Sequence, residues 1–435
     1  MEMEIMNVKI PIYSEHLLYD ITVCDGKVIQ IVPHEEMRKG GKSFSFSIQN
    51  KGNFTNMIWD ADGRILLPGF TDIHMHIDKS HSLPFAPNVS GTLMEAINSY
   101  TQASEGFTEE NIKERMTKTI LTAIAYGTTT IRTHIDFSTR VNEETTFRGI
   151  RMALEVKKEF APFIDIQVYP LLPFYPYSDK DRKKIEKLLT MDIDGIGGAP
   201  HLCTEPTECV EELFYYAVKK NLPLDLHTDE SDDPNIDTVL TIADNTIKYK
   251  YEGKVVVDHL CSLSAMDQEK ANYVLKKMQE AKLGAVTLPA ANLYLQGRQD
   301  SGVVRRGVTR VKEMLEREIL LATASDNICD PFHPFGRGDL LQIAQITGYA
   351  AHMGGKADLI QLLKMITEIP TNLAGQIKKG INIGDEASFV LFDSTSIESL
   401  FAELPQTRAV FSASRWLSMT NSHVQFDLKA GSLKI

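Results

Sequence analysis

The middle of this 435-residue chain alternates short apolar runs with longer amphipathic segments. Segment 109–126, for example, repeats an apolar residue at every fourth position behind an acidic first turn, which is typical of a helix packed on a sheet. Such alternation predicts parallel strands joined by helical crossovers, and eight units predict a closed (β/α)₈ TIM-type barrel. The expected strands are Phe70–His74, Thr128–His134, Asp165–Leu171, Gly195–Ala199, Pro223–His227, Lys254–His259, Gly284–Leu288 and Ile319–Ala324. An open doubly wound sheet is the alternative, but no GxGxxG or P-loop segment supports it.

Both ends of the chain have a different texture. Segments 20–23 and 27–32 near the start, and 387–392 and 408–411 near the end, are short β-type runs. Near the start, apolar and polar residues alternate with a period of two, which indicates strands with one buried face. We therefore expect an α/β protein in which residues 1–66 and 378–435 form a small β-sandwich domain and residues 67–377 form the barrel.

Charge and composition exclude several classes of protein. The chain has 46 Lys and Arg against 58 Asp and Glu, a net charge of -12, which argues against a nucleic-acid partner. No apolar run approaches the roughly 18–20 residues of a membrane span, and the first residues are acidic rather than basic as in a secretory signal. Five scattered cysteines form no CxxC pair. We expect a cytoplasmic protein without a membrane partner; a homo-oligomer is compatible with the sequence.

Metal-compatible side chains follow several predicted strands. His74 and His76 are two positions apart on an extended chain, so both imidazoles point to the same face, and imidazole is a good ligand for divalent metals. A single HxH pair is a weak signal, because many such pairs are surface or core residues. The signal strengthens because the fifth strand ends at His227 and is followed by Glu230, the sixth ends at His259, and the eighth precedes Asp326.

Each of these residues also has an ordinary structural interpretation. His259 fits a hydrogen-bonded core histidine, Asp326 a helix N-cap, and Glu230 a solvated loop residue. The carboxyl ends of barrel strands meet at one mouth, however, so the residues together predict a metal hydrolase site.

Several local motifs resemble the amidohydrolase superfamily, and within it the cytosine deaminase-like branch. The resemblance covers nearly the whole chain, and the segments 77–80 and 326–327 are also similar to N-isopropylammelide isopropylaminohydrolase. The closest local matches are Pro68-Gly69-Phe70, Ser90-Gly91-Thr92-Leu93, Leu295-Gln296-Gly297-Arg298, the segment 305–313 and Ser325-Asp326-Asn327.

This resemblance implies one divalent metal ion, zinc or iron, and a set of residues around it. Two-metal members of the superfamily use a carboxylated lysine or a glutamate near the end of strand four, and no lysine occurs between Lys187 and Lys219, although Glu205 and Glu208 follow that strand. His201 is interpreted as pocket lining. The implied metal ligands are His74, His76, His227 and Asp326, and the implied catalytic residues are Glu230 as proton carrier, His259 as the residue that steers the attacking water, and Asp326 as base.

The expected reaction is hydrolytic removal of an exocyclic amine or alkylamine from a small nitrogen heterocycle, such as cytosine or a related pyrimidine or triazine. Pro173 stands where cytosine-specific enzymes carry a glutamine, and Asn327 replaces an aspartate, so the exact ring stays open. Lys79 and Gln296 are further candidate substrate contacts, although Lys79 could equally be a surface charge. The alternatives are an amide-ring hydrolase of the dihydroorotase kind and a non-enzymatic scaffold of the same fold.

Overall fold

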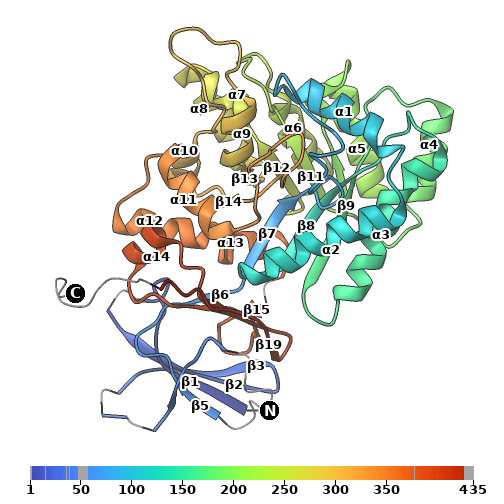
Figure 1. Ribbon diagram of the computed structural model, residues 1–435. Coiled ribbons are helices and arrows are strands. Elements are labelled where there is room, and N and C mark those ends of the chain that lie inside the picture. Colours follow the sequence, from blue (N-terminus) through green and yellow to red (C-terminus); the bar gives the residue numbers. More distant parts are fainter. Residues whose placement is uncertain are drawn as a thin grey trace.

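Eight parallel strands form the centre of the molecule, as predicted. The computed structural model describes residues 2–14, 16–35, 37–38, 40–47, 57–376 and 378–425. The strands follow each other in chain order around the sheet, and an isolated parallel bridge between Met75 and Asp326 brings its first and last strands together (Figure 1). Their bounds are β7 Phe70–Met75, β8 Thr128–Asp136, β9 Asp165–Leu171, β10 Ile196–Gly198, β11 Leu224–Thr228, β12 Val255–His259, β13 Gly284–Thr287 and β14 Leu321–Thr323.

Helices cover the outside of this barrel (Figure 1). Helix α2 shows why these segments are helical: Thr108 caps its first turn by accepting a hydrogen bond from Asn111 N, and the apolar residues of the predicted face are buried. The bounds are α1 Leu93–Ser104, α2 Glu109–Ala125, α3 Glu143–Phe160, α4 Asp179–Leu188, the 3₁₀ turn η1 Pro200–Leu202, α5 Pro206–Lys220, α6 Thr238–Tyr249, α7 Cys261–Ala265, α8 Gln268–Glu280, α9 Pro289–Leu295, α10 Val311–Glu316, α11 Leu340–Ala350, α12 Lys356–Lys364 and α13 Glu368–Leu373.

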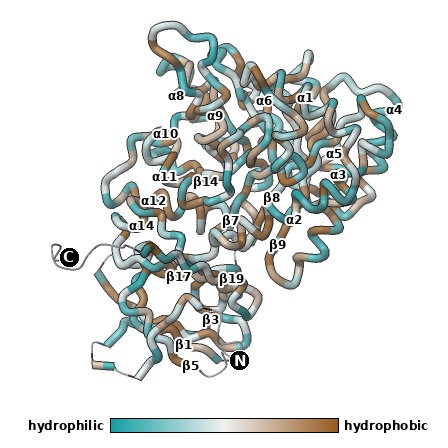
Figure 2. The backbone as a smooth tube through the Cα atoms, in the orientation of Figure 1, coloured by the Kyte–Doolittle hydropathy of each residue, from teal (hydrophilic) through white to brown (hydrophobic). Residues whose placement is uncertain are grey.

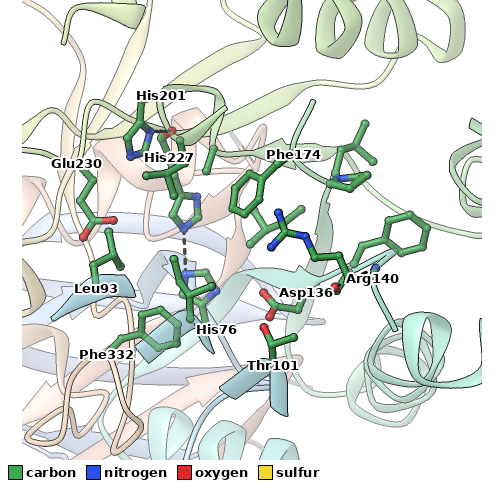
Figure 3. Close-up of a pocket in the computed structure, with 18 of the residues that line it drawn as sticks. His76, Leu93, Thr101, Asp136, Arg140, Phe174, His201, His227, Glu230 and Phe332 are labelled. Carbon is green, nitrogen blue, oxygen red and sulfur yellow. Dashed lines mark hydrogen bonds between the residues drawn. The ribbon is translucent and has the colours of Figure 1, made fainter. Parts of the chain in front are cut away.

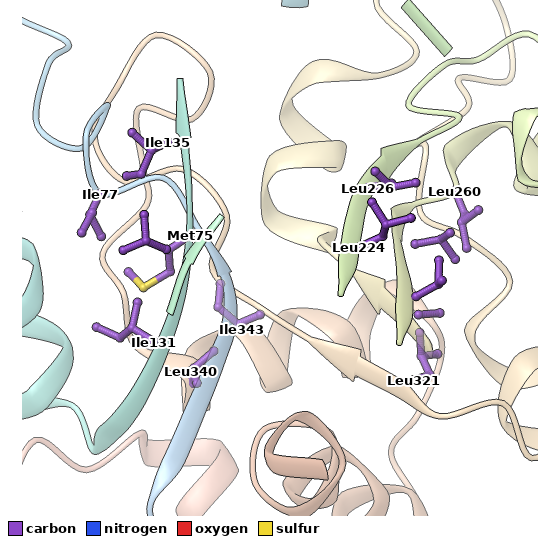
Figure 4. Close-up of a cluster of buried hydrophobic side chains, with 14 of the residues drawn as sticks. Met75, Ile77, Ile131, Ile135, Leu224, Leu226, Leu260, Leu321, Leu340 and Ile343 are labelled. Atoms are coloured by element: carbon purple, nitrogen blue, oxygen red, sulfur yellow. The ribbon is translucent and has the colours of Figure 1, made fainter. Parts of the chain in front are cut away.

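The main hydrophobic core lies between the strands and these helices. Met75 and Ile131 on neighbouring strands are fully buried in the same cluster as Leu340 and Ile343 of α11 (Figure 4). Burying one such aliphatic side chain stabilises the fold by roughly 1.5–3 kcal/mol. This continuous packing holds the strand ends in fixed positions, as a site built from several strands requires.

The two chain ends form further sheets beside the barrel (Figure 1). One sheet has the order β15-β16-β3-β2-β1-β5-β4 and the other β19-β18-β17-β6, so each combines strands from both ends of the chain. The bounds are β1 Glu2–Lys9, β2 Leu18–Cys24, β3 Lys27–Pro33, β4 Lys42–Ser43, β5 Met57–Asp60, β6 Leu66–Pro68, β15 Lys379–Gly380, β16 Glu386–Ala387, β17 Phe389–Phe392, β18 Arg408–Ser412 and β19 Arg415–Thr420, with helix α14 Ile397–Glu403 between β17 and β18.

A second hydrophobic core joins these two sheets. It contains Ile5 and Ile21 from the first sheet and Phe389 and Phe411 from the second, the two rings being stacked with centroids 4.8 Å apart. Strand β17 is among the most hydrophobic stretches in Figure 2. The domain limits 1–66 with 378–435, and 67–377, stay a prediction, and residues 48–56 and 426–435 lie outside the described part of the chain.

Candidate metal centre and active site

The four predicted ligands converge at one end of the barrel. His74 Nε2 and His76 Nε2 lie 3.6 and 3.4 Å from Asp326 Oδ1. His227 Nε2 lies 3.1 Å from His76 Nε2, the contact drawn as a dashed line in Figure 3. All four side chains are buried. Residues that are up to about 250 positions apart in the chain therefore meet in one cluster, although their roles stay proposals.

The backbone at these strand ends is unusual. Asp326 N donates a hydrogen bond to His74 O at 2.9 Å, which joins the last strand to the first directly at the cluster. Asp229, His259 and Asp326 have φ angles of 52°, 63° and 60°, in the left-handed region that non-glycine residues seldom adopt. Each such residue costs about 1–3 kcal/mol and persists only where the surrounding structure enforces it. Three such residues therefore stand at the strand ends beside the cluster.

The chemistry of the cluster fits a cation. Burial first, and the neighbouring imidazoles next, hold the pKa values of His74 and His227 well below the usual range, so these rings are neutral and carry lone pairs. Burial and the charge of Lys79 do the same for the pKa of His76. Spacings of 3.1–3.6 Å between ligand atoms match the roughly 3.4 Å edge of a tetrahedron with metal–ligand distances near 2.1 Å. Without a cation, His74 Nε2 and Asp326 Oδ1 are buried and have no hydrogen-bond partner.

Glu230 faces the same cavity from the loop after β11. Burial raises the pKa of its carboxyl group to about 8, although the nearby charge of Lys79 opposes the shift. Its Oε1 lies 3.6 Å from His259 Nδ1. The preceding residue, Asp229, anchors the loop, because both of its carboxylate oxygens accept backbone N–H groups at the start of α6. Glu230 is therefore a buried carboxyl group on an anchored loop, with a pKa above neutrality.

His259 has a buried partner that sequence reasoning missed. The Asn292 side-chain amide on α9 lies 3.0 Å from His259 Nδ1, and Asn292 is fully buried. Nothing in the local sequence distinguishes this asparagine from a solvated one. The contact orients the imidazole so that Nε2, which has no hydrogen-bond partner, is the free nitrogen of the ring.

A cavity of about 500 Å³ opens beside the cluster. Its size is within the usual range of small-molecule sites, roughly 300–1,000 Å³. Arg140 and Phe174 lie on the side away from Glu230 (Figure 3). The apolar part of its wall consists mainly of Leu93, Ile97, Phe137, Leu171, Leu172, Pro173, Phe174, Leu295 and Phe332.

Most of the predicted substrate contacts line this cavity. Lys79, Pro173 and Asn327 do so, and His201 does as expected, with its Nδ1 donating to the backbone oxygen of His227 at 3.1 Å. Gln296 does not: α9 ends at Leu295, which lines the cavity in its place. The structure thus does not bring Gln296 to the site.

Two further outcomes concern charged residues around the cavity. Lys79 is no surface charge: it is 5% exposed, and its Nζ lies 2.7 Å from Asp136 Oδ1, a partner that was not predicted. Burial lowers the pKa of Lys79, but Asp136 and Asp78 outweigh that effect and raise it. Glu205 and Glu208, the remaining candidates for a second metal, are exposed and do not line the cavity.

A second set of possible ligand atoms overlaps the first. One nitrogen or oxygen from each of His74, His134, His227 and Asp258 lies within 4.8 Å of the others. His134 lies in the second predicted strand and Asp258 directly precedes His259, so both were visible in the sequence but were not selected.

A model of the amidohydrolase family matches residues 65–434. The chain belongs to this family. The match confirms the recognised superfamily and the predicted enzyme class, a hydrolase of carbon–nitrogen bonds other than peptide bonds. It also supports dependence on a metal, for which the His and Asp cluster is available.

Relatives of this amidohydrolase include enzymes with different substrates. It is 27% identical over 395 residues to pterin deaminase from Rhizobium rhizogenes, which covers 90% of this chain and 85% of that protein. It is 27% identical over 346 residues to N-isopropylammelide isopropyl amidohydrolase from Pseudomonas sp., covering 78% and 82%. The structure of 5-methylcytosine deaminase from Klebsiella pneumoniae bound to 5-fluorocytosine has a TM-score of 0.87 at 24% identity, covering 97% of this chain and 99% of that one. The last comparison shows a shared fold.

Proposed function

We propose that this amidohydrolase is a metal-dependent deaminase that hydrolyses an exocyclic amine or alkylamine from a small nitrogen heterocycle. One observation carries the proposal: His76, His227 and Asp326 of the buried cluster line the same cavity as Glu230, whose pKa burial raises to about 8, and His74 Nε2 lies 3.6 Å from Asp326. The first group can bind a cation and the second can deliver a proton, which are the two requirements for displacing an amine with water at neutral pH.

The cation is a single divalent ion, zinc or iron, held by His74, His76, His227 and Asp326. When bound, such an ion makes water a competent nucleophile near neutral pH, where its pKa would otherwise be about 15.7. The absence of a lysine between positions 187 and 219 and the exposure of Glu205 and Glu208 support a count of one.

Residues of this chain then handle the protons. Asp326 accepts the proton of the attacking water as oxygen bonds to the ring carbon that bears the amine. Glu230 donates its proton to a ring nitrogen. Its carboxylate then takes the proton of the new hydroxyl group and passes it to the departing amine as the carbon–nitrogen bond breaks and the ring carbonyl forms, and the proton held by Asp326 restores Glu230. The Nε2 atom of His259 hydrogen-bonds the attacking oxygen. The products are a ring carbonyl and ammonia, or an alkylamine.

Substrate recognition is assigned to the other residues of the cavity. Lys79 and Asn327 supply polar contacts, and Pro173 is part of the apolar lining that accepts a flat ring. Relatives that act on a pterin and on N-isopropylammelide support a ring with an amino or alkylamino substituent. Cytosine, other aminopyrimidines and aminotriazines belong to the same chemical class.

The remaining expectations stay proposals of the same kind. We place the enzyme in the cytoplasm, without nucleic acid as a partner, and a homo-oligomer remains open. Within the described ranges, every helix falls short of the length or the hydrophobicity that a bilayer-spanning segment requires. The intact ligand cluster argues against a scaffold, and the missing lysine argues against an amide-ring hydrolase of the dihydroorotase kind.

A substrate panel tests the proposal. Metal-loaded enzyme is incubated with cytosine, an aminotriazine, N-isopropylammelide and pterin, and both amine release and new carboxylate are quantified. We expect amine release from at least one ring, and loss of that activity in Glu230→Gln at unchanged metal content. Lys113→Gln, a surface change on α2, serves as the control with full activity. Carboxylate formation without amine would instead identify an amide-ring hydrolase, and no product from any ring would refute the deaminase.

A further inference from the structure

Behind the proposed ligands lies a set of charged side chains that the reaction does not use. Arg132 and His134 of β8, Asp225 of β11 and Asp258 of β12 are each at most 2% exposed, and none of them lines the cavity. We call these four residues the supporting layer. Burying so many ionisable groups is unfavourable unless they are paired, so their presence needs a physical reason.

The supporting layer contains one internal ion pair with a hydrogen bond. Arg132 Nη1 donates to Asp225 Oδ2 at 2.6 Å, and His134 Nε2 lies 3.4 Å from Asp225 Oδ1. Arg132 thereby balances the charge of Asp225. Asp258 has no such cation: His134 Nε2 is 3.9 Å from its Oδ2, and neither of its oxygens has a hydrogen-bond partner.

A ring nitrogen of a proposed metal ligand lies close to Asp258. Asp258 Oδ2 lies 3.0 Å from His74 Nδ1; both side chains are fully buried, and neither atom has another hydrogen-bond partner. The other nitrogen of that ring, Nε2, is the one that faces Asp326 at 3.6 Å. The imidazole of His74 is thus placed between a carboxylate on one side and the ligand cluster on the other.

We propose that Asp258 is a positioning residue for the metal: its Oδ2, 3.0 Å from His74 Nδ1, accepts a hydrogen bond from Nδ1–H when the cation is held at Nε2. A neutral imidazole carries one proton, so holding it on Nδ1 leaves the lone pair on Nε2, directed at the cation. The carboxylate also makes His74 a stronger donor, and losing such a partner weakens metal binding by roughly 10- to 100-fold in metalloproteins. The inference rests on the single cation of the proposed function.

A second metal ion is the competing explanation for these residues. An ion held by His74, His134, His227 and Asp258 would have to share His74 and His227 with the first site. Two ions can share an imidazole only if it loses its remaining proton. The guanidinium of Arg132, next to Asp225, also places a fixed positive charge beside this group. Both features favour a supporting carboxylate over a second ion.

The test is metal affinity, measured by competition with a chromophoric chelator, together with the number of Zn²⁺ ions bound per chain. We expect one ion in the wild-type enzyme, roughly 10- to 100-fold weaker binding in Asp258→Ala, and a smaller loss in Asp258→Asn, whose amide oxygen can still accept from Nδ1–H. Asp339→Asn is the matched control. It removes a buried carboxylate from its ion pair with Arg408 beside β18, so it lowers the melting temperature and leaves metal affinity unchanged.

Each other outcome has a distinct meaning. Unchanged affinity in both Asp258 variants would overturn the inference and leave the deaminase intact. Two ions in the wild type, of which only one is lost in Asp258→Ala, would overturn it in favour of a second metal site. If the wild type binds no Zn²⁺ or Fe²⁺, the proposed function itself fails. Should Asp258→Ala not fold, Asp258→Asn decides between these results.

Discussion

Two groups of histidines and carboxylates lie next to each other in the barrel, and they differ in how their charges are satisfied. The ligand cluster consists of His74, His76, His227 and Asp326. Its last three members line an open cavity, and it contains buried acceptor atoms without hydrogen-bond partners. The supporting layer is closed off from that cavity, and its ion pair of Arg132 with Asp225 is made within the protein. Unpaired acceptors are tolerated where a ligand completes them, whereas an enclosed cation such as Arg132 needs an anion from the fold; the unpaired Oδ2 of Asp258 is the part of the supporting layer that lies next to His74. The difference separates the residues that we propose bind the metal from the residues that support them.

The largest effect is expected from removing a ligand. His227→Ala should abolish metal binding and lower turnover by at least about 10⁴-fold, because water then returns to a pKa near 15.7. Metal content by elemental analysis and amine release are measured on the same sample. Full activity in a metal-free variant would show that the cluster is not the reacting centre. It would also refute the distinction between metal-binding residues and a supporting layer.

The second-largest effect is expected from replacing the proton donor. Glu230→Gln should lower kcat by roughly 10²- to 10⁴-fold while the metal stays bound, because the amide cannot donate a carboxyl proton. The pKa of about 8 gives the sign of the pH dependence: the donating form is present below about pH 8 and is lost as the pH rises through it, so activity should fall on the alkaline side. A pH–rate profile checks both points, and an alkaline limb that persists in Glu230→Gln would assign it to another group.

Breaking the ion pair of the supporting layer should act on stability instead. Arg132→Met leaves Asp225 buried without its cation, and such a loss typically lowers the free energy of unfolding by about 3–5 kcal/mol. Denaturant unfolding measures the change. If Arg132→Met were as stable as the wild type, the supporting layer would not depend on internal charge balance.

The smallest effect is expected from breaking an ion pair on the surface. Lys113 of α2 contacts Glu155 and Glu159 of α3, each at 2.6 Å, and all three side chains are partly exposed. Because solvent and salt screen such pairs, Lys113→Gln should leave the melting temperature and the activity unchanged within error. A clear loss of stability would mean that an exposed ion pair can contribute as much as the buried pair of Arg132 with Asp225, contrary to the proposal.

Much of the fold could be read from local pattern. All eight predicted barrel strands are present, and the sheets at both ends of the chain follow the period-two runs, because burial on a sheet leaves a regular trace in the sequence. The ligand candidates could also be selected in advance, since residues at the carboxyl ends of barrel strands must share one mouth. Gln296 does not line the cavity, although the adjacent Leu295 does.

The partners of the candidate residues could not be predicted in this way. Strict alternation would send Asp258 and His259 to opposite faces of β12, yet Asp258 reaches His74 while His259 lines the cavity. The left-handed backbone at His259, with φ of 63°, breaks the alternation at this point. Asn292 and Asp136 were missed for a related reason, because each is defined only by a contact with a residue far away in the chain.

The sequence by itself determined the strands, the family resemblance and the identity of the metal-compatible side chains, because these depend on residue type and on spacing along one segment. Only the tertiary structure decided which atoms meet, that Lys79 is enclosed and paired, and that Asp258 lies behind His74. Those outcomes depend on distances between strands that are far apart in the chain, and on the loss of water around charges that no local pattern records.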